Sequence, residues 1–149
     1  MTTLNIGDKA PDFSGINQYG EEVSLEQFKG KKIVLFFYPK ASTPGCTAEA
    51  CNLQDNIQRF ENEGYQIIGV SADSQKRQAN FAEKNKLDYP LIADEDKTII
   101  NAYGVWGPKK FMGREYDGIH RTTFIIDENG IIQNIIIKVK TKDHANQIL

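Results

Sequence analysis

The stretch "KKIVLFFYP" at residues 31–39 constrains the fold more than any other segment of the chain. It is a continuous run of β-branched and aromatic residues, which is typical of a strand buried on both faces. Pro39 ends the run, because proline has no N–H to donate to a central ladder. A strand covered on both sides needs a layer of chain above and another below it, so the run predicts a layered α/β architecture.

The segments after this strand alternate between helical and extended patterns. The sequence predicts a helix over 44–63, a buried strand over 66–73, a helix near 75–86, a short strand within 89–96 and a helix near 97–103. Residues 104–113 fit an irregular loop, residues 120–139 a hairpin that turns at 127–130, and a last helix begins near Asp143. Alternating elements followed by a hairpin predict a sandwich with a mixed sheet.

The opening of the chain fits a hairpin about Tyr19–Gly20, with a short helical turn after Ser24. A chain of 149 residues can bury the core of one domain. Since no repeat or linker interrupts it, we expect one domain over residues 1–149.

The predicted helix after Pro44 carries both cysteines of the chain. Thr43 is expected to be its N-cap, Pro44 suits the first helical position, and Gly64 suits its end. Apolar residues recur at helical spacing and give one stripe along this helix, made of Cys46, Ala50, Leu53, Ile57 and Phe60.

Cys46 falls in the first turn of this helix, where unpaired amide N–H groups favour an anion. The thiolate is the nucleophilic form of cysteine, so Cys46 is predicted to be an activated nucleophile. Cys51 lies further along the helix and receives less of this field. The structural alternative is that Cys46 is only a small core residue of the apolar stripe.

The two thiols cannot be joined on an undistorted helix. Five residues rise about 7.5 Å and rotate about 140°, which places the Cα atoms about 8.6 Å apart, whereas a disulfide tolerates up to about 7 Å. Either the pair never joins or the helix unwinds when it does. A permanent structural disulfide between Cys46 and Cys51 is therefore disfavoured. A zinc site is also disfavoured, because only His120 and His144 remain as further soft ligands and neither has metal-type spacing.

The segment "FYPKASTPGCTAEAC" resembles the active-site segment of the peroxiredoxins, whose pattern Pro-x-x-x-Thr-x-x-Cys is met by Pro39, Thr43 and Cys46. Cys51 stands where the bacterioferritin comigratory protein, or peroxiredoxin Q, subgroup carries its resolving cysteine. "GDKAPDF", "GVWGPKKFMGREYDGIHRTTFIIDENG" and "KTKDHANQIL" have the look of the same subgroup. The resemblance implies a thioredoxin-like sandwich: a mixed central sheet flanked by helices, with an N-terminal β-hairpin extension.

The resemblance also implies the chemistry. The chain is expected to be a thiol-dependent peroxidase that reduces hydrogen peroxide and organic hydroperoxides through a sulfenic acid on Cys46. Cys51 resolves this acid to an intramolecular disulfide after local unwinding, and thioredoxin or a similar dithiol reduces the disulfide. No cofactor or metal is expected.

Roles for the surrounding residues follow from the same resemblance. Thr43 holds the peroxide, Pro39 shields the thiolate from water, and Arg121 matches the family's arginine from a distant strand. Gly45 is counted with the substrate-binding residues, and Glu49 is a supporting residue whose role is open. An arginine suits this site because its guanidinium is always charged and presents a fixed fork of donors.

Three neighbouring residues receive weaker assignments from the sequence. Tyr38 and Trp106 are expected to pack rather than react, with an aromatic wall near the pocket as the alternative. His120 is predicted to be non-catalytic, because strand alternation points it away from the face of Arg121.

Composition and charge bear on partners and location. With 26% charged residues and a formal net charge of −2, the chain lacks the basic stripe of a nucleic-acid binder. It has no apolar run of the ~18 residues that span a membrane. We expect a cytoplasmic monomer, although members of the subgroup also occur as dimers. The alternative functions are a peroxide-sensing thiol-disulfide relay and a disulfide reductase; the missing Cys-x-x-Cys disfavours the latter.

Overall fold

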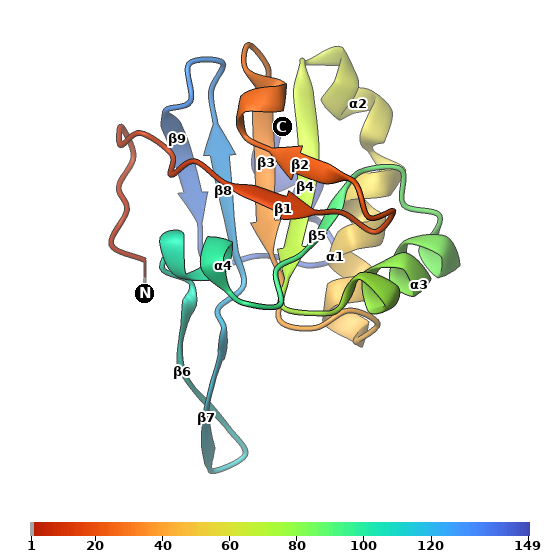
Figure 1. The fold of residues 1–149 in the computed structure, drawn as a ribbon, viewed down its shortest axis with the longest axis vertical. Coiled ribbons are helices and arrows are strands. Elements are labelled where there is room, and N and C mark those ends of the chain that lie inside the picture. The colour runs from red at the N-terminus through yellow and green to blue at the C-terminus, as the bar shows by residue number, and fades with distance from the viewer. Residues whose placement is uncertain (1) are drawn as a thin grey trace.

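A five-stranded sheet forms the centre of the structure, a computed structural model that describes residues 2–149 (Figure 1). Its strands are β3 (Lys32–Phe37), β4 (Tyr65–Ser71), β5 (Leu91–Ala93), β8 (Thr122–Ile126) and β9 (Ile132–Ile136). Their spatial order is β5-β4-β3-β8-β9. Strands β3, β4 and β5 run parallel, while β8 runs antiparallel to both β3 and β9. The mixed sheet predicted from the sequence is confirmed.

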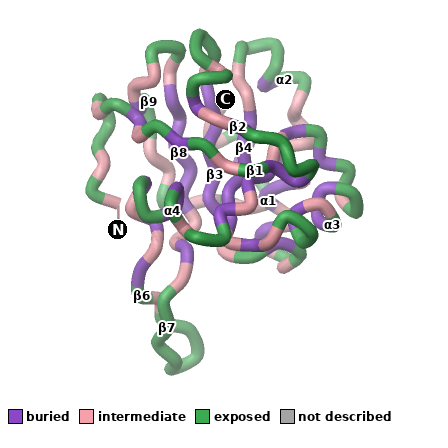
Figure 2. Tube along the Cα trace, viewed as in Figure 1, coloured by how far each residue is buried: buried purple, intermediate pink, exposed green. Residues whose placement is uncertain are grey.

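Strand β3 lies in the middle of this sheet because both of its faces are apolar. Ile33, Leu35 and Phe37 belong to one hydrophobic core, and Val34 and Phe36 belong to the other. Successive side chains of a strand point to opposite faces, so the continuous apolar run supplies both cores at once. Figure 2 shows the buried strands between two more exposed outer layers.

Most of the helices cover one face of the sheet, and the N-terminal segments together with α4 cover the other (Figure 1). The helical layer consists of α1 (Pro44–Asp55), α2 (Ile57–Asn62), α3 (Gln75–Asn85) and α5 (His144–Ile148). The opposite layer consists of the hairpin of β1 (Ser14–Ile16) and β2 (Glu22–Ser24), the short 3-10 helix η1 (Glu26–Phe28) and α4 (Thr98–Ala102). This arrangement is the thioredoxin-like fold with an N-terminal hairpin that the resemblance implied.

The single helix predicted over 44–63 is wrong, because the chain forms two helices with a break at Asn56. The backbone N–H of Asn56 donates to the carbonyl of Leu53 at 3.2 Å, a three-residue bond that ends α1. Asparagine side chains also compete for backbone partners, and here Nδ2 of Asn56 donates to the carbonyl of Asn52. The predicted end of the segment holds, since α2 ends at Asn62, Glu63 is its C-cap, and Gly64 follows with φ of 80°.

The irregular loop predicted over 104–113 is also wrong. Strand β6 (Trp106–Phe111) pairs antiparallel with β7 (Arg114–Ile119), and this hairpin projects from the body of the molecule (Figure 1). Its two-residue turn, Met112–Gly113, has φ of 51° and 77°, as a type I′ turn requires. The Asn-Gly or Asp-Gly pair that usually marks such a turn is absent, so the sequence carried no strong hairpin signal.

The sheet topology decides which residues meet at the site. Phe37, the last residue of β3, pairs with Thr122, the first residue of β8. The loop that leads into α1 and the residues that precede β8 therefore lie at the same edge of the sheet. No helix in residues 2–149 is both long and apolar enough to cross a membrane.

Candidate active site

Cys46 occupies the third position of α1 and is almost completely buried, with 1% of its surface exposed. Pro44 opens the helix, and Thr43 precedes it with an extended backbone at φ −87° and ψ 155°. The amide groups of this first turn have no partners further back in the helix, so their dipoles favour a negative sulfur.

The structure corrects one role predicted for Thr43. Thr43 stands at the N-cap position and its carbonyl accepts from the N–H of Thr47 at 2.9 Å, but its side chain makes no capping bond. Its hydroxyl instead donates to the carbonyl of Lys40 at 2.8 Å. The hydroxyl therefore stabilises the loop before the helix.

Arg121 joins the site from the other side. It lies directly before β8, and its Nη2 donates to the sulfur of Cys46 at 3.3 Å. Its Nη1 donates to Oε1 of Glu49 at 2.6 Å. Cys46 and Glu49 are three residues apart on α1, so they lie on the same face of the helix. One guanidinium fork thus binds two groups of the same helix.

Charge explains the electrostatics of this cluster. Burial alone lowers the pKa of Arg121, but the charges and hydrogen bonds of Cys46 and Glu49 outweigh it and raise the pKa overall. Burial raises the pKa of Glu49 to about 7, even though the Arg121 charge opposes the shift. The guanidinium therefore stays charged beside the sulfur, while the carboxyl group titrates near neutral pH.

His120 and Arg121 lie between β7 and β8 rather than within a strand, so strand alternation does not apply to them. Nε2 of His120 contacts the carbonyl of Pro108 at 2.9 Å, whereas Arg121 contacts Cys46 and Glu49. The non-catalytic role of His120 stays a prediction. Tyr38 is fully buried and its hydroxyl donates to Oε1 of Gln78, which agrees with a packing role; that role stays a prediction.

Cys51 lies further along α1 and is partly buried. Its sulfur contacts Oδ1 of Asn85 on α3 at 3.6 Å. Partial burial, with a smaller effect from the charge of Asp55, raises the pKa of the Cys51 thiol. Both cysteines are free on one unbroken helix, so the geometry that forbids a disulfide on an intact helix applies to this state.

A hollow of about 390 Å³ lies beside the site, between the end of β3 and the β6–β7 hairpin. Pro39 and Trp106 both line it, so Trp106 is an aromatic wall in addition to packing against the core. Its lining residues are Pro39, Lys40, Ala72, Asp73, Trp106, Lys109, Tyr116, Asp117, Gly118 and Ile119.

The sequence reasoning missed Lys109, which lines this hollow. Its Nζ donates to the carbonyl of Ile119 at 2.9 Å. Burial, and then the charge of Arg121, lowers the pKa of Lys109, while the Cys46 thiolate acts in the opposite direction. Lys109 is thus a second cation near the sulfur. The sequence WGPKKF of β6 has no clear alternation of apolar and polar residues, and that segment was interpreted as a loop.

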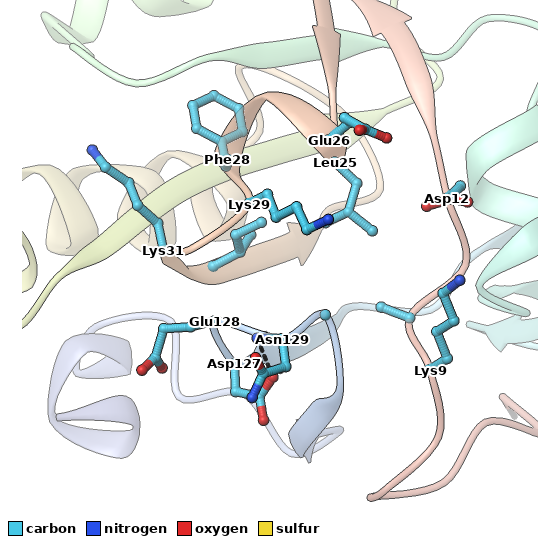
Figure 3. A pocket seen from close by; sticks show the side chains of 13 residues that line it. Lys9, Asp12, Leu25, Glu26, Phe28, Lys29, Lys31, Asp127, Glu128 and Asn129 are labelled. Atoms are coloured by element: carbon cyan, nitrogen blue, oxygen red, sulfur yellow. Dashed lines mark hydrogen bonds between the residues drawn. The ribbon is translucent and has the colours of Figure 1, made fainter.

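Another hollow, of about 260 Å³, lies at the opposite end of the sheet (Figure 3). Lys31 and Ile33 near the start of β3 line it, together with the turn at 127–130. Lysines and carboxylates alternate around it, and Asp127 already accepts from the N–H groups of Asn129 and Ile131. Neither cysteine lines this hollow.

Comparison with known proteins identifies the class that this fold and site define. The AhpC/TSA family matches residues 6–135, which is most of the chain. The chain belongs to the AhpC/TSA family and is a peroxiredoxin enzyme.

More specific relatives share nearly the whole length. The putative peroxiredoxin bcp of Haemophilus influenzae is 46% identical over 149 residues, which cover 100% of this chain and 96% of the relative. Peroxiredoxin Bcp of Bacillus subtilis is 46% identical over 147 residues, covering 99% and 94%. Among solved structures, a Xanthomonas campestris peroxiredoxin Q mutant matches with a TM-score of 0.88 and 33% identity, covering 99% and 94%. A Xylella fastidiosa PrxQ mutant matches with a TM-score of 0.93 and 28% identity, over the same shares. Within the family, these are Bcp/peroxiredoxin Q homologues.

Proposed function

We propose that this peroxiredoxin reduces hydrogen peroxide and organic hydroperoxides with Cys46 as the attacking thiolate and Cys51 as the resolving thiol. The contact of 3.3 Å between Nη2 of Arg121 and the Cys46 sulfur, at the start of a helix, carries the proposal. A Xanthomonas campestris bacterioferritin comigratory protein of similar structure is described for its alkyl peroxide reduction activity, which supports organic hydroperoxides as substrates.

The first step is a displacement at one oxygen of the hydroperoxide. The Cys46 sulfur attacks the terminal oxygen and the O–O bond breaks. The leaving alkoxide, or hydroxide when the substrate is hydrogen peroxide, takes a proton from solvent to become the alcohol or water. Sulfur is oxidised to the sulfenic acid, and the peroxide is reduced. Arg121 stabilises both the thiolate and the charge that spreads over the oxygens, an effect worth ~10²–10³ in rate for a preorganised donor.

Thr43, Gly45 and Pro39 complete the substrate side in this proposal. The Thr43 hydroxyl holds the peroxide, after turning from the carbonyl of Lys40 that it contacts in the free site. Gly45 leaves room for the substrate beside the guanidinium, and Pro39 shields the sulfur. Glu49 supports Arg121 from behind.

In the second step the Cys51 sulfur attacks the Cys46 sulfenic acid, and water leaves as the disulfide forms. This step needs unwinding near residues 44–52, because the intact helix keeps the Cα atoms about 8.6 Å apart. The contacts that must break include apolar packing of Cys46 and Ala50 and several polar contacts. Asn52 bonds to the carbonyl of Lys142 at 3.1 Å and to the N–H of Ala145 at 2.8 Å, and Cys51 contacts Asn85. Thioredoxin or a similar dithiol then reduces the disulfide.

A peroxide-consumption assay with catalytic thioredoxin tests the whole cycle. We expect Cys46→Ser to abolish consumption, and Cys51→Ser to complete one turnover and then stop unless another thiol resolves the sulfenic acid. Full activity of Cys46→Ser would overturn the proposal. A stable mixed disulfide with a partner protein, without steady turnover, would instead support the thiol-disulfide relay.

A further inference from the structure

His144 is a buried titratable residue that the reaction described above does not use. It is the first residue of α5 and has no exposed surface. Its Nδ1 lies 2.7 Å from Oε1 of Gln147, which only accepts, so Nδ1 carries a hydrogen. In the neutral ring Nε2 is then an acceptor, and it lies 2.7 Å from the hydroxyl of Thr123.

The same Nε2 faces the far oxygen of Glu49. The distance from Nε2 of His144 to Oε2 of Glu49 is 3.5 Å. Oε1 of Glu49 accepts from Arg121, whereas Oε2 has no hydrogen-bond partner in residues 2–149. A buried carboxylate oxygen without a donor is costly. Once the Thr123 hydroxyl rotates away from Nε2, one proton between Nε2 and Oε2 removes that cost, either as O–H toward nitrogen or as N–H toward oxygen.

We propose that His144 is a positioning residue of the peroxidase: it shares one proton with Glu49 in the buried layer behind Arg121, and this pair fixes the guanidinium against the Cys46 sulfur. The inference rests on the proposed role of Cys46. It assigns His144, from the last helix, to the active site at the start of α1.

The charges around the pair make this proton exchangeable near neutral pH. Burial raises the pKa of Glu49 to about 7, and burial together with the Arg121 charge lowers the pKa of His144. The groups that face the pair are Arg121 before β8, Cys46 on α1, Tyr89 before β5, and Lys109 on β6 beyond Arg121. Arg121 is the one cation in direct contact with Glu49 in the described chain.

The docking of α5 does not require a histidine at this position. Asn52 of α1 already ties the end of the chain through the carbonyl of Lys142 and the N–H of Ala145. Ala145 also packs into the hydrophobic core of the helical layer. Nε2 of His144 also accepts from the Thr123 hydroxyl on β8, which helps to dock α5; its approach to Oε2 of Glu49 is the contact that serves the carboxylate.

The test measures the second-order rate constant for oxidation of Cys46 by hydrogen peroxide in the reduced full-length chain, by stopped flow. His144→Leu leaves Oε2 of Glu49 without a donor, so we expect a loss of about tenfold from a displaced guanidinium. His144→Gln keeps a donor of similar reach, and we expect recovery to within about threefold. Asn146→Ala is the matched control on the same helix. Within the described residues 2–149, the side chain of Asn146 bonds to Asp143 and Arg59 and to no group of the active site, so the rate should not change.

A second arm separates positioning from general loosening. In the Glu49→Gln background, His144→Leu should cause no further loss, because its target is gone. Additive losses in that background, or a wild-type rate for His144→Leu, would overturn the inference. Should His144→Leu fail to fold, the oxidation rates of His144→Gln and His144→Asn are compared instead. The asparagine side chain is too short to reach Glu49, so His144→Asn should react more slowly. Equal rates for the two variants would overturn the inference.

These outcomes are distinct from a failure of the proposed function. If the wild-type chain reacts no faster than Cys46→Ser, the role of Cys46 is wrong and both proposals fall. If the wild-type chain reacts at Cys46 and the His144 variants match it, only the role of His144 is wrong.

Discussion

At the scale of single residues, the site depends on how one guanidinium is shared. Arg121 donates to the Cys46 sulfur with one nitrogen and to Glu49 with another. The fork has a fixed geometry, so the position of Glu49 determines where the other nitrogen meets the sulfur. Small displacements around Arg121 should therefore affect the rate more than the stability.

Gly45→Ala tests this separation. A Cβ at position 45 would lie 3.3 Å from Nη2 of Arg121, so the guanidinium must move by a few tenths of an ångström. Alanine is also a better helix residue than glycine, by up to about 1 kcal/mol. We expect a rate of Cys46 oxidation about tenfold lower, with unchanged or higher stability. Stopped-flow oxidation and urea unfolding measure the two, and a wild-type rate would contradict the prediction.

Glu49 should make stability depend on pH in a specific direction. Its folded pKa of about 7 lies above its ordinary value of 4.5, so the folded state favours the protonated carboxyl and stability falls as pH rises from 4.5 through 7. His144, whose pKa is lowered, acts in the opposite sense: it costs stability as pH falls below about 6.5.

Glu49→Gln removes the first contribution. We expect the stability of this variant relative to wild type to be greater at pH 8 than at pH 5, by about 2–3 kcal/mol. Urea unfolding at the two pH values measures the difference. A difference that does not change with pH would mean that Glu49 is ionised throughout this range.

At the scale of elements, α1 carries both thiols and the β6–β7 hairpin forms one wall of the neighbouring hollow. Of these two elements, the hairpin is expected to be the less stable. Its turn residue Met112 is 87% exposed and has a positive φ, a backbone conformation that side chains other than asparagine and glycine adopt at a cost.

Met112→Asn should therefore tighten the hairpin. Asparagine followed by Gly113 is a preferred type I′ pair, and we expect a gain of about 0.5–1 kcal/mol. Amide hydrogen exchange in residues 106–119 and urea unfolding measure it. Met112→Val, with a β-branched side chain, is the matched control and should weaken the hairpin. Equal protection in both variants would argue against this turn type.

At the scale of the whole molecule, the reaction cycle requires the fold to lose part of its helical layer. Cys46, Ala50 and Leu53 are all buried against the sheet by α1. Unwinding near residues 44–52 exposes much of this surface, which costs about 4 kcal/mol by apolar area. A disulfide that closes so short a loop stabilises the folded state by only about 2 kcal/mol, because it restricts the unfolded chain only a little.

The oxidised protein should therefore be less stable than the reduced one, the reverse of the usual effect of a disulfide. We expect a melting temperature lower by about 5 °C. Calorimetry of the reduced and peroxide-treated chain measures it, with Cys51→Ser under the same treatment as the control that forms no intramolecular bond. A higher melting temperature after oxidation would show that α1 does not unwind.

The one-domain organisation, the cytoplasmic location and the monomeric state stay predictions.

The sequence by itself determined the features that depend on neighbours along the chain. The apolar run of β3, the helix start at Pro44 and the reach between Cys46 and Cys51 all follow from local periodicity and backbone geometry. The family pattern added Arg121 and Glu49 as residues of the site, but not their contacts.

Only the tertiary structure decided what surrounds the sulfur. Arg121 lies 75 positions from Cys46 and 72 from Glu49, and His144 comes from the last helix. Their meeting depends on β8 pairing with β3 and on α5 docking against α1. The β6–β7 hairpin, which brings Lys109 to the site, has a turn without the usual residues. Elements far apart in the sequence pack through apolar surfaces that many different sequences could form. No short motif therefore encodes which side chains this packing brings together.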